Sequence, residues 1–406
     1  MNEVAEKIAA EITREGAISF ARFMDLALYC PEYGYYEKEE DTIGRRGDFY
    51  TSVSVGGLFG ELLAFQFAQW LAEPAAPKNQ AALSISGDDE RRQIVEAGAH
   101  DGRLAGDILG WLRQHRPLLY ERLEYLIVEP SARRRDRQAT SLSPYKHKVR
   151  WITELNALAV GQETSTPHPP GSPLHVSRFT SHVPPCIIFA NELLDAFPVH
   201  RLAWDAPRRQ WFEWGVRLQG GRLAWTRMPD RPDSPPLPQS FDLPSDLLAV
   251  LPDGFVLEVC PAAETWWRQA ARLLDRGKLL TLDYGADEAL APERCAGTLR
   301  AYYRHRRIDD VLDRPGEQDL TAHVNFPSLI DAGEAEGLRT ESFTSQERFL
   351  TRIAAQLWAT PADTGEWPPQ YKRQFHTLTH PQLLGRTFRV LVQSRATTAA
   401  APSAAP

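Results

Sequence analysis

The stretch QIVEAGAHDGRLAGDIL, residues 93–109, decides the expected fold of this chain. A short apolar run ends in the acid Glu96, a turn of small residues follows, and an amphipathic helix begins near Gly102. A strand, turn and helix of this kind place backbone N–H groups at the carboxyl end of a parallel sheet, where open α/β folds bind ligands. An ordinary strand-to-helix turn without a ligand is the alternative interpretation.

The spacing of the glycines narrows the class of ligand. Gly98 and Gly102 are present, but His100 and Asp101 lie between them, so the turn lacks the G-x-G-x-x-G spacing of dinucleotide-binding folds. This spacing argues against a nicotinamide-dependent oxidoreductase, which is one alternative function for a sheet of this kind.

Outward from this stretch, short apolar strands alternate with amphipathic helices. Helices are expected at 102–114 and 131–141, and the expected strands are 93–97, 123–129, 148–152, 186–190, 255–260 and 278–284, with a late pair at 337–343 and 386–393. This alternation predicts an α/β fold with a parallel sheet and right-handed crossovers.

The regions around this core divide the chain. Residues 1–73 read as a helical and irregular N-terminal region, with Ser19 as an N-cap, and residues 93–393 as the main domain. A β-rich lobe is expected to be inserted at 199–246, and the tail at 394–406 is expected to be disordered. The lobe contains Trp204, Trp211, Trp214 and Trp225, which we interpret as a small second core rather than as an interface.

Composition excludes several classes of protein. The 406 residues include 53 acids and 46 bases, so the formal charge of −7 gives no global attraction to nucleic acid or to anionic membranes. The four cysteines are far apart and show no metal-ligand spacing. No targeting segment and no apolar run of membrane-spanning length stands out, so we expect a cytoplasmic protein without a metal and without membrane insertion.

Acids follow the predicted strands at their carboxyl ends. Glu129 ends the second strand, where an acid in nucleoside-binding folds accepts hydrogen bonds from ribose hydroxyls; a charge at a helix N-terminus is the alternative. Asn191, Glu192 and Asp195 follow the fourth strand, where two carboxylates suit a guanidinium; capping of a short helix is the alternative. Asp283 ends a later strand in the same way, next to Tyr284.

Two histidines in polar clusters are possible bases. His305 lies in GTLRAYYRH at 297–305, and His323 lies in DLTAHVNF at 319–326. A single histidine is more often a structural hydrogen-bonding residue, and that alternative stays open for both. No nucleophile elbow and no phosphate-binding loop is present in the sequence.

The ordered set of motifs resembles the MidA family. The motifs are GYY at 34–36, GDFYTS at 47–52, LFGELLA at 58–64, E-x-G-x-x-x-G at 96–102, NELLDAFPV at 191–199, LDYG at 282–285, and the two histidine clusters named above. The resemblance runs from about Ile18 to about Leu350. It implies a class I S-adenosylmethionine-dependent methyltransferase with a Rossmann-like sheet, mostly parallel with a late antiparallel strand.

The resemblance also implies roles for particular residues. Its mitochondrial member is an assembly factor for respiratory complex I that methylates an arginine of a complex I subunit, so a protein substrate is expected here. Glu192 and Asp195 are then catalytic, and Asp283, Tyr284 and His323 contact the substrate. The cofactor S-adenosylmethionine is held by a larger set: Glu96, Gly98, Gly102, Glu129, Gly47, Asp48, Thr51, Ser52 and Asn191.

The sequence departs from the family pattern at three places. His100 stands where the family has the middle glycine of E-x-G-x-G-x-G, Val53 and Ser54 replace a Pro-Glu pair, and Asn325 replaces an Asp. These departures leave a second hypothesis open, in which the protein is a non-catalytic scaffold that keeps the fold and binds a partner.

Overall fold

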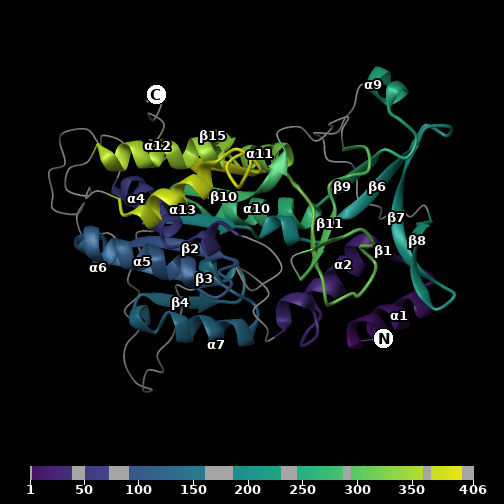
Figure 1. The fold of residues 1–406 in the computed structure, drawn as a ribbon, viewed down its shortest axis with the longest axis horizontal. Helices are drawn as coiled ribbons and strands as arrows, with labels where there is room; N and C mark the ends of the chain where they lie inside the picture. The colour runs from purple at the N-terminus through teal and green to yellow at the C-terminus, as the bar shows by residue number, and fades with distance from the viewer. Residues whose placement is uncertain are drawn as a thin grey trace, which may run out of the picture.

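The computed structural model describes residues 2–38, 51–72, 91–160, 186–229, 245–286, 294–304, 306–359 and 367–395. Figure 1 shows two parts side by side: a large sheet covered by helices, and a smaller β-rich lobe that packs against the N-terminal helices. Among the described helices, none combines the length and the apolar character needed to cross a membrane.

The large sheet has the order β15-β16-β10-β5-β2-β3-β4, with β14 beside β10. Strands β4, β3, β2, β5 and β10 pair in parallel, and β16 is antiparallel to both of its neighbours. The sequence-based expectation of a mostly parallel sheet with a late antiparallel strand is therefore confirmed. The bounds are β2 Arg92–Ala97, β3 Leu123–Val128, β4 Val149–Ile152, β5 Cys186–Asn191, β10 Gly277–Ala286, β14 Val324–Asn325, β15 Arg339–Ser345 and β16 Phe388–Arg395.

Helices cover both faces of this sheet because the strands are apolar on both faces. Ile94 and Leu280 pack under α4 (Leu58–Ala72), α5 (Arg103–His115), α12 (Gln346–Trp358) and α13 (Pro369–Thr379). Their chain neighbours Val95 and Leu279 face the opposite way, toward α10 (Pro261–Leu273) and α11 (Phe326–Ala335). Burying one such side chain contributes about 1.5–3 kcal/mol, so this three-layer core holds the strand ends in place.

The smaller lobe is an antiparallel sheet of β1 (Ile18–Ser19), β6 (His200–Asp205), β7 (Gln210–Gln219), β8 (Arg222–Arg227) and β9 (Val256–Val259). The expectation that 255–260 belongs to the large sheet is wrong, because β9 pairs with β6. The lobe accordingly extends past the predicted end at 246. The sequence of β9, three apolar residues and Glu258, suits a strand in either sheet, and only the pairing partner decides which one.

The N-terminal helices complete this lobe. The helices α1 (Glu3–Glu15) and α2 (Phe20–Tyr29) form a core with Val216 of β7, and Ser19 accepts a hydrogen bond from Arg22 N as the N-cap of α2. Trp204 is buried, and the ring of Trp225 lies 5.0 Å from that of Phe20. The expected second core of four tryptophans is thus present only in part: Trp225 packs on the core of the N-terminal helices, and Trp211 packs on a separate small cluster of the lobe.

The remaining elements surround the two sheets. The first two residues of the expected disordered tail, Ser394 and Arg395, end β16 instead, because both pair with β10. Residues 396–406 are outside the described part. A third sheet contains β11 Arg300–Tyr303, β12 Arg306–Ile308 and β13 Asp319–Thr321; the short helices are η1 Tyr35–Glu37, α3 Ser52–Val55, α6 Pro117–Arg122, α7 Ala132–Ser141, η2 Ser143–Tyr145, α8 Ala157–Val160, η3 Leu194–Ala196 and α9 Ser245–Val250.

Candidate functional site

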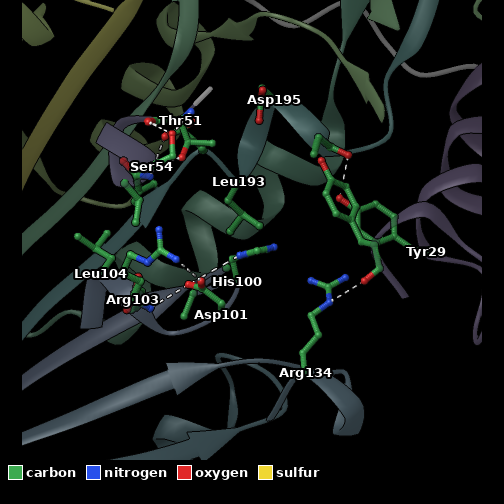
Figure 2. A pocket seen from close by; sticks show the side chains of 18 residues that line it. Tyr29, Thr51, Ser54, His100, Asp101, Arg103, Leu104, Arg134, Leu193 and Asp195 are labelled. Atoms are coloured by element: carbon green, nitrogen blue, oxygen red, sulfur yellow. Dashed lines mark hydrogen bonds and ion pairs between the residues drawn. The ribbon is translucent and has the colours of Figure 1, made fainter. Parts of the chain in front are cut away.

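A pocket lies at the carboxyl ends of β2 and β5, where the sequence predicts ligand binding. The turn after β2 forms one wall, the segment after β5 forms the floor, and residues of α2, η1, α3 and α7 close the remaining sides (Figure 2). The empty space, including the part open to solvent, is about 1020 Å³. Its lining includes Tyr29, Tyr36, Thr51, Val53, Ser54, Glu96, Gly98, His100, Asp101, Arg103, Arg134, Asn191, Glu192, Leu193 and Asp195.

The turn between β2 and α5 has an unusual backbone. Gly98, His100 and Gly102 have φ values of 76°, 47° and 80°, all in the left-handed region. Glycine adopts this region freely, whereas another residue costs about 1–3 kcal/mol there. A Cβ on Gly98 would lie 2.9 Å from Leu193 Cδ1. The two glycines are therefore required by the fold of the turn, and His100 is a strained exception.

Glu96 at the end of β2 lies almost fully buried beside the pocket. Its Oε2 accepts a hydrogen bond of 2.7 Å from the Tyr125 hydroxyl. Burial raises the pKa of Glu96 to about 8, because the buried carboxyl lacks the water that would stabilise its charged form. At neutral pH the group is mainly protonated in the free protein.

Glu129 is buried at the end of β3, but it does not line the pocket. Its carboxylate accepts hydrogen bonds from Ser131 N at 3.0 Å and from Gln138 Nε2 at 3.1 Å. Arg134 Nη1 lies 3.8 Å away, and Arg134 itself lines the pocket. Glu129, which was predicted to bind the ribose, thus lies at the expected edge of the sheet but behind Arg134. Arg134 also donates a hydrogen bond to the carbonyl oxygen of Tyr36.

Glu192 follows β5 directly and points into the pocket. Its Oε1 accepts from Ser52 N at 2.9 Å and from Asn191 Nδ2 at 3.2 Å, so α3 is held against the floor of the site. Within the described residues, Glu192 Oε2 and Asn191 Oδ1 are buried and have no hydrogen-bond partner. Burial raises the pKa of Glu192 to about 8. The described part of the site therefore contains two buried oxygen atoms without a hydrogen-bond partner, and at neutral pH Glu192 is mainly protonated.

Asp195 and Asp283 are neighbouring buried acids. Asp283 Oδ2 accepts from the backbone N–H groups of Leu193 and Leu194, at 3.2 and 2.9 Å, and so shapes η3. Burial raises the pKa of Asp283 to about 7, and burial together with the neighbouring Asp283 raises the pKa of Asp195 well above its ordinary value. Asp195 lines the pocket, whereas Asp283 lies behind it and supports the chain.

Some of the other predicted site residues lie at the pocket, and others lie away from it. Thr51 lines the pocket and caps α3, and Ser52 beside it anchors Glu192. Tyr284 packs on Phe388, and burial, together with the positive charges of Arg294 and Arg300, lowers the pKa of His323 to about 4. Neither residue lines the pocket. Gly47, Asp48 and His305 lie outside the described residues.

Sequence reasoning missed three residues of the pocket wall. Tyr29 and Tyr36 stack with ring centroids 5.6 Å apart, and the guanidinium of Arg134 lies 5.5 Å from the Tyr36 ring. Tyr36 belongs to the GYY motif, to which the sequence assigned no role in the site. Tyr29 and Arg134 carried no signal, because only the packing of α2 and α7 against this edge brings them to the site.

The residues present fit S-adenosylmethionine. The left-handed turn allows close approach of a ligand to the backbone, and the buried acids Glu96, Glu192 and Asp195 in the lining suit a cationic sulfonium and ammonium. Fold and site together define an α/β methyltransferase. When bound, S-adenosylmethionine supplies an activated methyl group.

Comparison with known proteins identifies the family. Residues 62–344 match the family described as S-adenosyl-L-methionine-dependent methyltransferase. The chain belongs to this family, which corresponds to the MidA-like methyltransferases expected from the motifs, and its cofactor is S-adenosylmethionine.

Relatives and solved structures agree with this assignment. Mouse "Protein arginine methyltransferase NDUFAF7, mitochondrial" is 28% identical over 93% of this chain and 81% of its own length. The human protein of that name is 30% identical over 79% of this chain and 66% of its own. A Burkholderia thailandensis protein, considered a methyltransferase and solved with S-adenosyl-homocysteine bound, is 30% identical with a TM-score of 0.73, covering 97% of this chain and 92% of that one.

Proposed function

We propose that this methyltransferase modifies an arginine side chain of a protein substrate, and that the substrate is a subunit of respiratory complex I, as the MidA resemblance implies. The names of the mouse and human relatives support arginine as the acceptor. The pocket supports it independently, through the charge and the hydrogen-bonding groups of its floor.

One observation carries the proposal: buried acceptors in the pocket floor lack a donor. Glu192 Oε2 and Asn191 Oδ1 have no partner among the described residues, and Asp195 lies in the same wall. A guanidinium has five N–H donors in a planar fork and a permanent positive charge, so it satisfies both acceptors and favours the ionised form of Glu192. Without a cationic partner the raised pKa keeps Glu192 mainly protonated at neutral pH, so its charged form calls for a cation.

Glu192 then has a defined task in the reaction. It would hold the guanidinium, one nitrogen of which would accept the methyl group that S-adenosylmethionine supplies in exchange for its S–CH₃ bond. The methylated guanidinium releases one proton to the Glu192 carboxylate, and S-adenosylhomocysteine is the second product. Positioning and exclusion of water account for most of the rate enhancement, because the methyl group is already activated.

The test is methylation of complex I subunits with isotopically labelled S-adenosylmethionine, followed by mass spectrometric mapping. The expected result is label on an arginine with the wild-type protein and a loss of at least about 100-fold in rate with Glu192→Gln, which keeps the shape and removes the charge. Titration with S-adenosylhomocysteine serves as the control that the variant still binds cofactor. Label on another residue type would contradict the arginine assignment, and cofactor binding without any methylation would favour the scaffold hypothesis.

A further inference from the structure

A group of arginines lies on the third sheet, outside the cofactor pocket. Arg300 and Tyr302 of β11 point to the same face of this sheet, because side chains alternate along a strand. Arg307 of β12 is exposed and is paired with Tyr302, so it lies on that face too. The opposite face, which contains Ala301, packs on the core of the N-terminal helices. The two arginines therefore lie on the face turned away from that core.

These arginines act on one another electrostatically, together with Arg294. Burial and the positive charges of Arg307 and Arg294 lower the pKa of Arg300. Burial and the charges of Arg294 and Arg300 likewise lower the pKa of His323, so its ring is neutral at physiological pH. His323 Nδ1 is buried and has no hydrogen-bond partner among the described residues. We call Arg294, Arg300 and Arg307 the basic cluster.

Two acids lie beside the basic cluster, and each already has another partner. The negative charge of Glu258 acts on Arg300, but the Glu258 carboxylate also lies 3.5 Å from Arg201 Nε. Asp319, on the neighbouring strand β13, accepts a hydrogen bond of 2.7 Å from the Tyr36 hydroxyl. Within the described part of the chain, the basic cluster therefore keeps a net positive charge, although the formal charge of the protein is −7.

The basic cluster adjoins the pocket through β13, and Figure 1 shows β11 between the large sheet and the smaller lobe. Ala322 N, directly after β13, donates to the carbonyl of Asp195 at 2.9 Å, and Asp195 lines the pocket. Arg300 lies across from Thr321, the chain neighbour of Ala322. Cross-strand partners are about 5 Å apart and chain neighbours about 3.8 Å, so Arg300 lies roughly 10 Å from Asp195, or about three residues of extended chain.

We propose that the basic cluster is a docking site for acidic residues of the substrate protein that lie about three or four residues from the target arginine. The carboxyl groups of the pocket then hold the arginine, while Arg300 and Arg307 hold the acidic side chains beside it. Guanidinium groups suit this task because they bind carboxylates through paired hydrogen bonds. The spacing rests on the proposed arginine acceptor, whereas the attraction of the basic cluster for acids does not.

The test is isothermal titration of the full-length protein, loaded with S-adenosylhomocysteine, with two peptides. One is Glu-Glu-Gly-Ser-Arg-Ser-Gly-Glu-Glu, and the other has glutamine at the four glutamate positions, which keeps their size without the charge. We expect the acidic peptide to bind about 10-fold more tightly at low salt, as two ion pairs would give. The preference should fall below about 2-fold in about 0.5 M sodium chloride, because salt screens exposed charges.

Substitutions locate the attraction on the sheet. Arg300→Gln and Arg307→Gln should each lower the preference for the acidic peptide to about 3-fold, because each removes one of the two ion pairs, and should leave binding of S-adenosylhomocysteine unchanged. Arg306→Gln is the matched control. It removes the same charge from the adjacent position of β12, which is paired with Tyr303 and faces the other way, so it should keep the full preference.

Equal binding of the two peptides, or an equal loss of preference in Arg306→Gln, would overturn the inference. A second pair of peptides, with neutral citrulline in place of arginine, separates it from the arginine proposal. If glutamate is still preferred in this pair while citrulline binds as well as arginine, the docking site stands and the arginine acceptor fails. If arginine is preferred to citrulline but glutamate is not preferred to glutamine, the docking site fails alone.

Discussion

At the scale of single residues, burial controls the chemistry of this site. Glu96 and Glu192 end neighbouring parallel strands, and burial raises the pKa of each to about 8. The sequence shows acids at these positions, but their protonation at neutral pH follows from the depth of the strand ends in the fold. Two predictions rest on this shift.

The first prediction concerns the pH dependence of turnover. Below pH 8 most Glu192 is protonated and cannot pair with a guanidinium, so kcat/KM for the arginine acceptor should rise with pH, by up to about 10-fold per unit, and level off near pH 8. Glu192→Gln should be much slower and lack this rise. Steady-state kinetics between pH 6 and 9 would decide, and a wild-type profile that is flat over this range would contradict the role of Glu192.

The second prediction concerns stability and uses Glu96→Gln, which keeps the shape of the side chain. The folded-state pKa of Glu96, about 8, lies above its ordinary value of 4.5, so the folded protein keeps a proton that the unfolded chain releases. Its contribution to stability is complete below about pH 4.5 and is lost as pH rises through 8. Urea unfolding at pH 5, 6.5 and 8 should show a steeper fall for the wild type than for the variant. Parallel curves would refute the shift.

At the scale of elements, the strand–turn–helix unit is the part that the sequence predicts best. The helix at 103–115 and the strand at 92–97 lie within a residue or so of the expected bounds. The reason is that the apolar pattern of the strand ends, and the 3.6-residue apolar pattern of the helix begins, at the glycines of the turn. What the pattern does not reveal is how η3 packs against the turn. Leu193 contacts the turn at Gly98, and this contact determines how much space remains above the backbone.

The third prediction tests this contact with a matched pair of glycine substitutions. Gly98→Ala should lower the free energy of unfolding by about 1–3 kcal/mol and weaken cofactor binding, because φ is 76° and the new Cβ meets Leu193 at 2.9 Å. Gly106→Ala in α5 should instead be neutral or raise stability by up to about 1 kcal/mol, since its Cβ finds its nearest neighbour at 3.7 Å. Unfolding curves and titration measure both; equal effects of the two substitutions would show that the turn tolerates a side chain.

At the scale of the whole molecule, the N-terminal region joins the two sheets. α1 and α2 close the core of the smaller lobe, while Tyr29 at the end of α2 and Tyr36 in η1 line the cofactor pocket. The family match begins at residue 62, so these elements lie outside it, yet they complete the site. Stability of the lobe and affinity for the cofactor should therefore be linked.

The fourth prediction tests this link at Ile8, which is fully buried between α1 and the lobe. Ile8→Ala should cost about 2–4 kcal/mol of unfolding free energy through lost burial and the cavity left behind. It should also weaken cofactor binding, although Ile8 is not part of the pocket lining. Ala10→Ser, on the exposed face of the same helix, is the control and should change stability by less than about 0.5 kcal/mol. Unchanged cofactor affinity in Ile8→Ala would argue against the coupling.

The sequence by itself determined the α/β class, the acids at the ends of the strands and the family. These features depend on local periodicity and on the order of motifs along the chain, and both can be read from a single sequence. Only the tertiary structure decided which sheet receives the strand at 256–259, that Glu129 lies behind Arg134, and that Asp283 and His323 stay outside the pocket. Strand pairing, side-chain exposure and shifts in pKa arise from contacts between segments far apart in the chain. Local sequence patterns do not encode those distances.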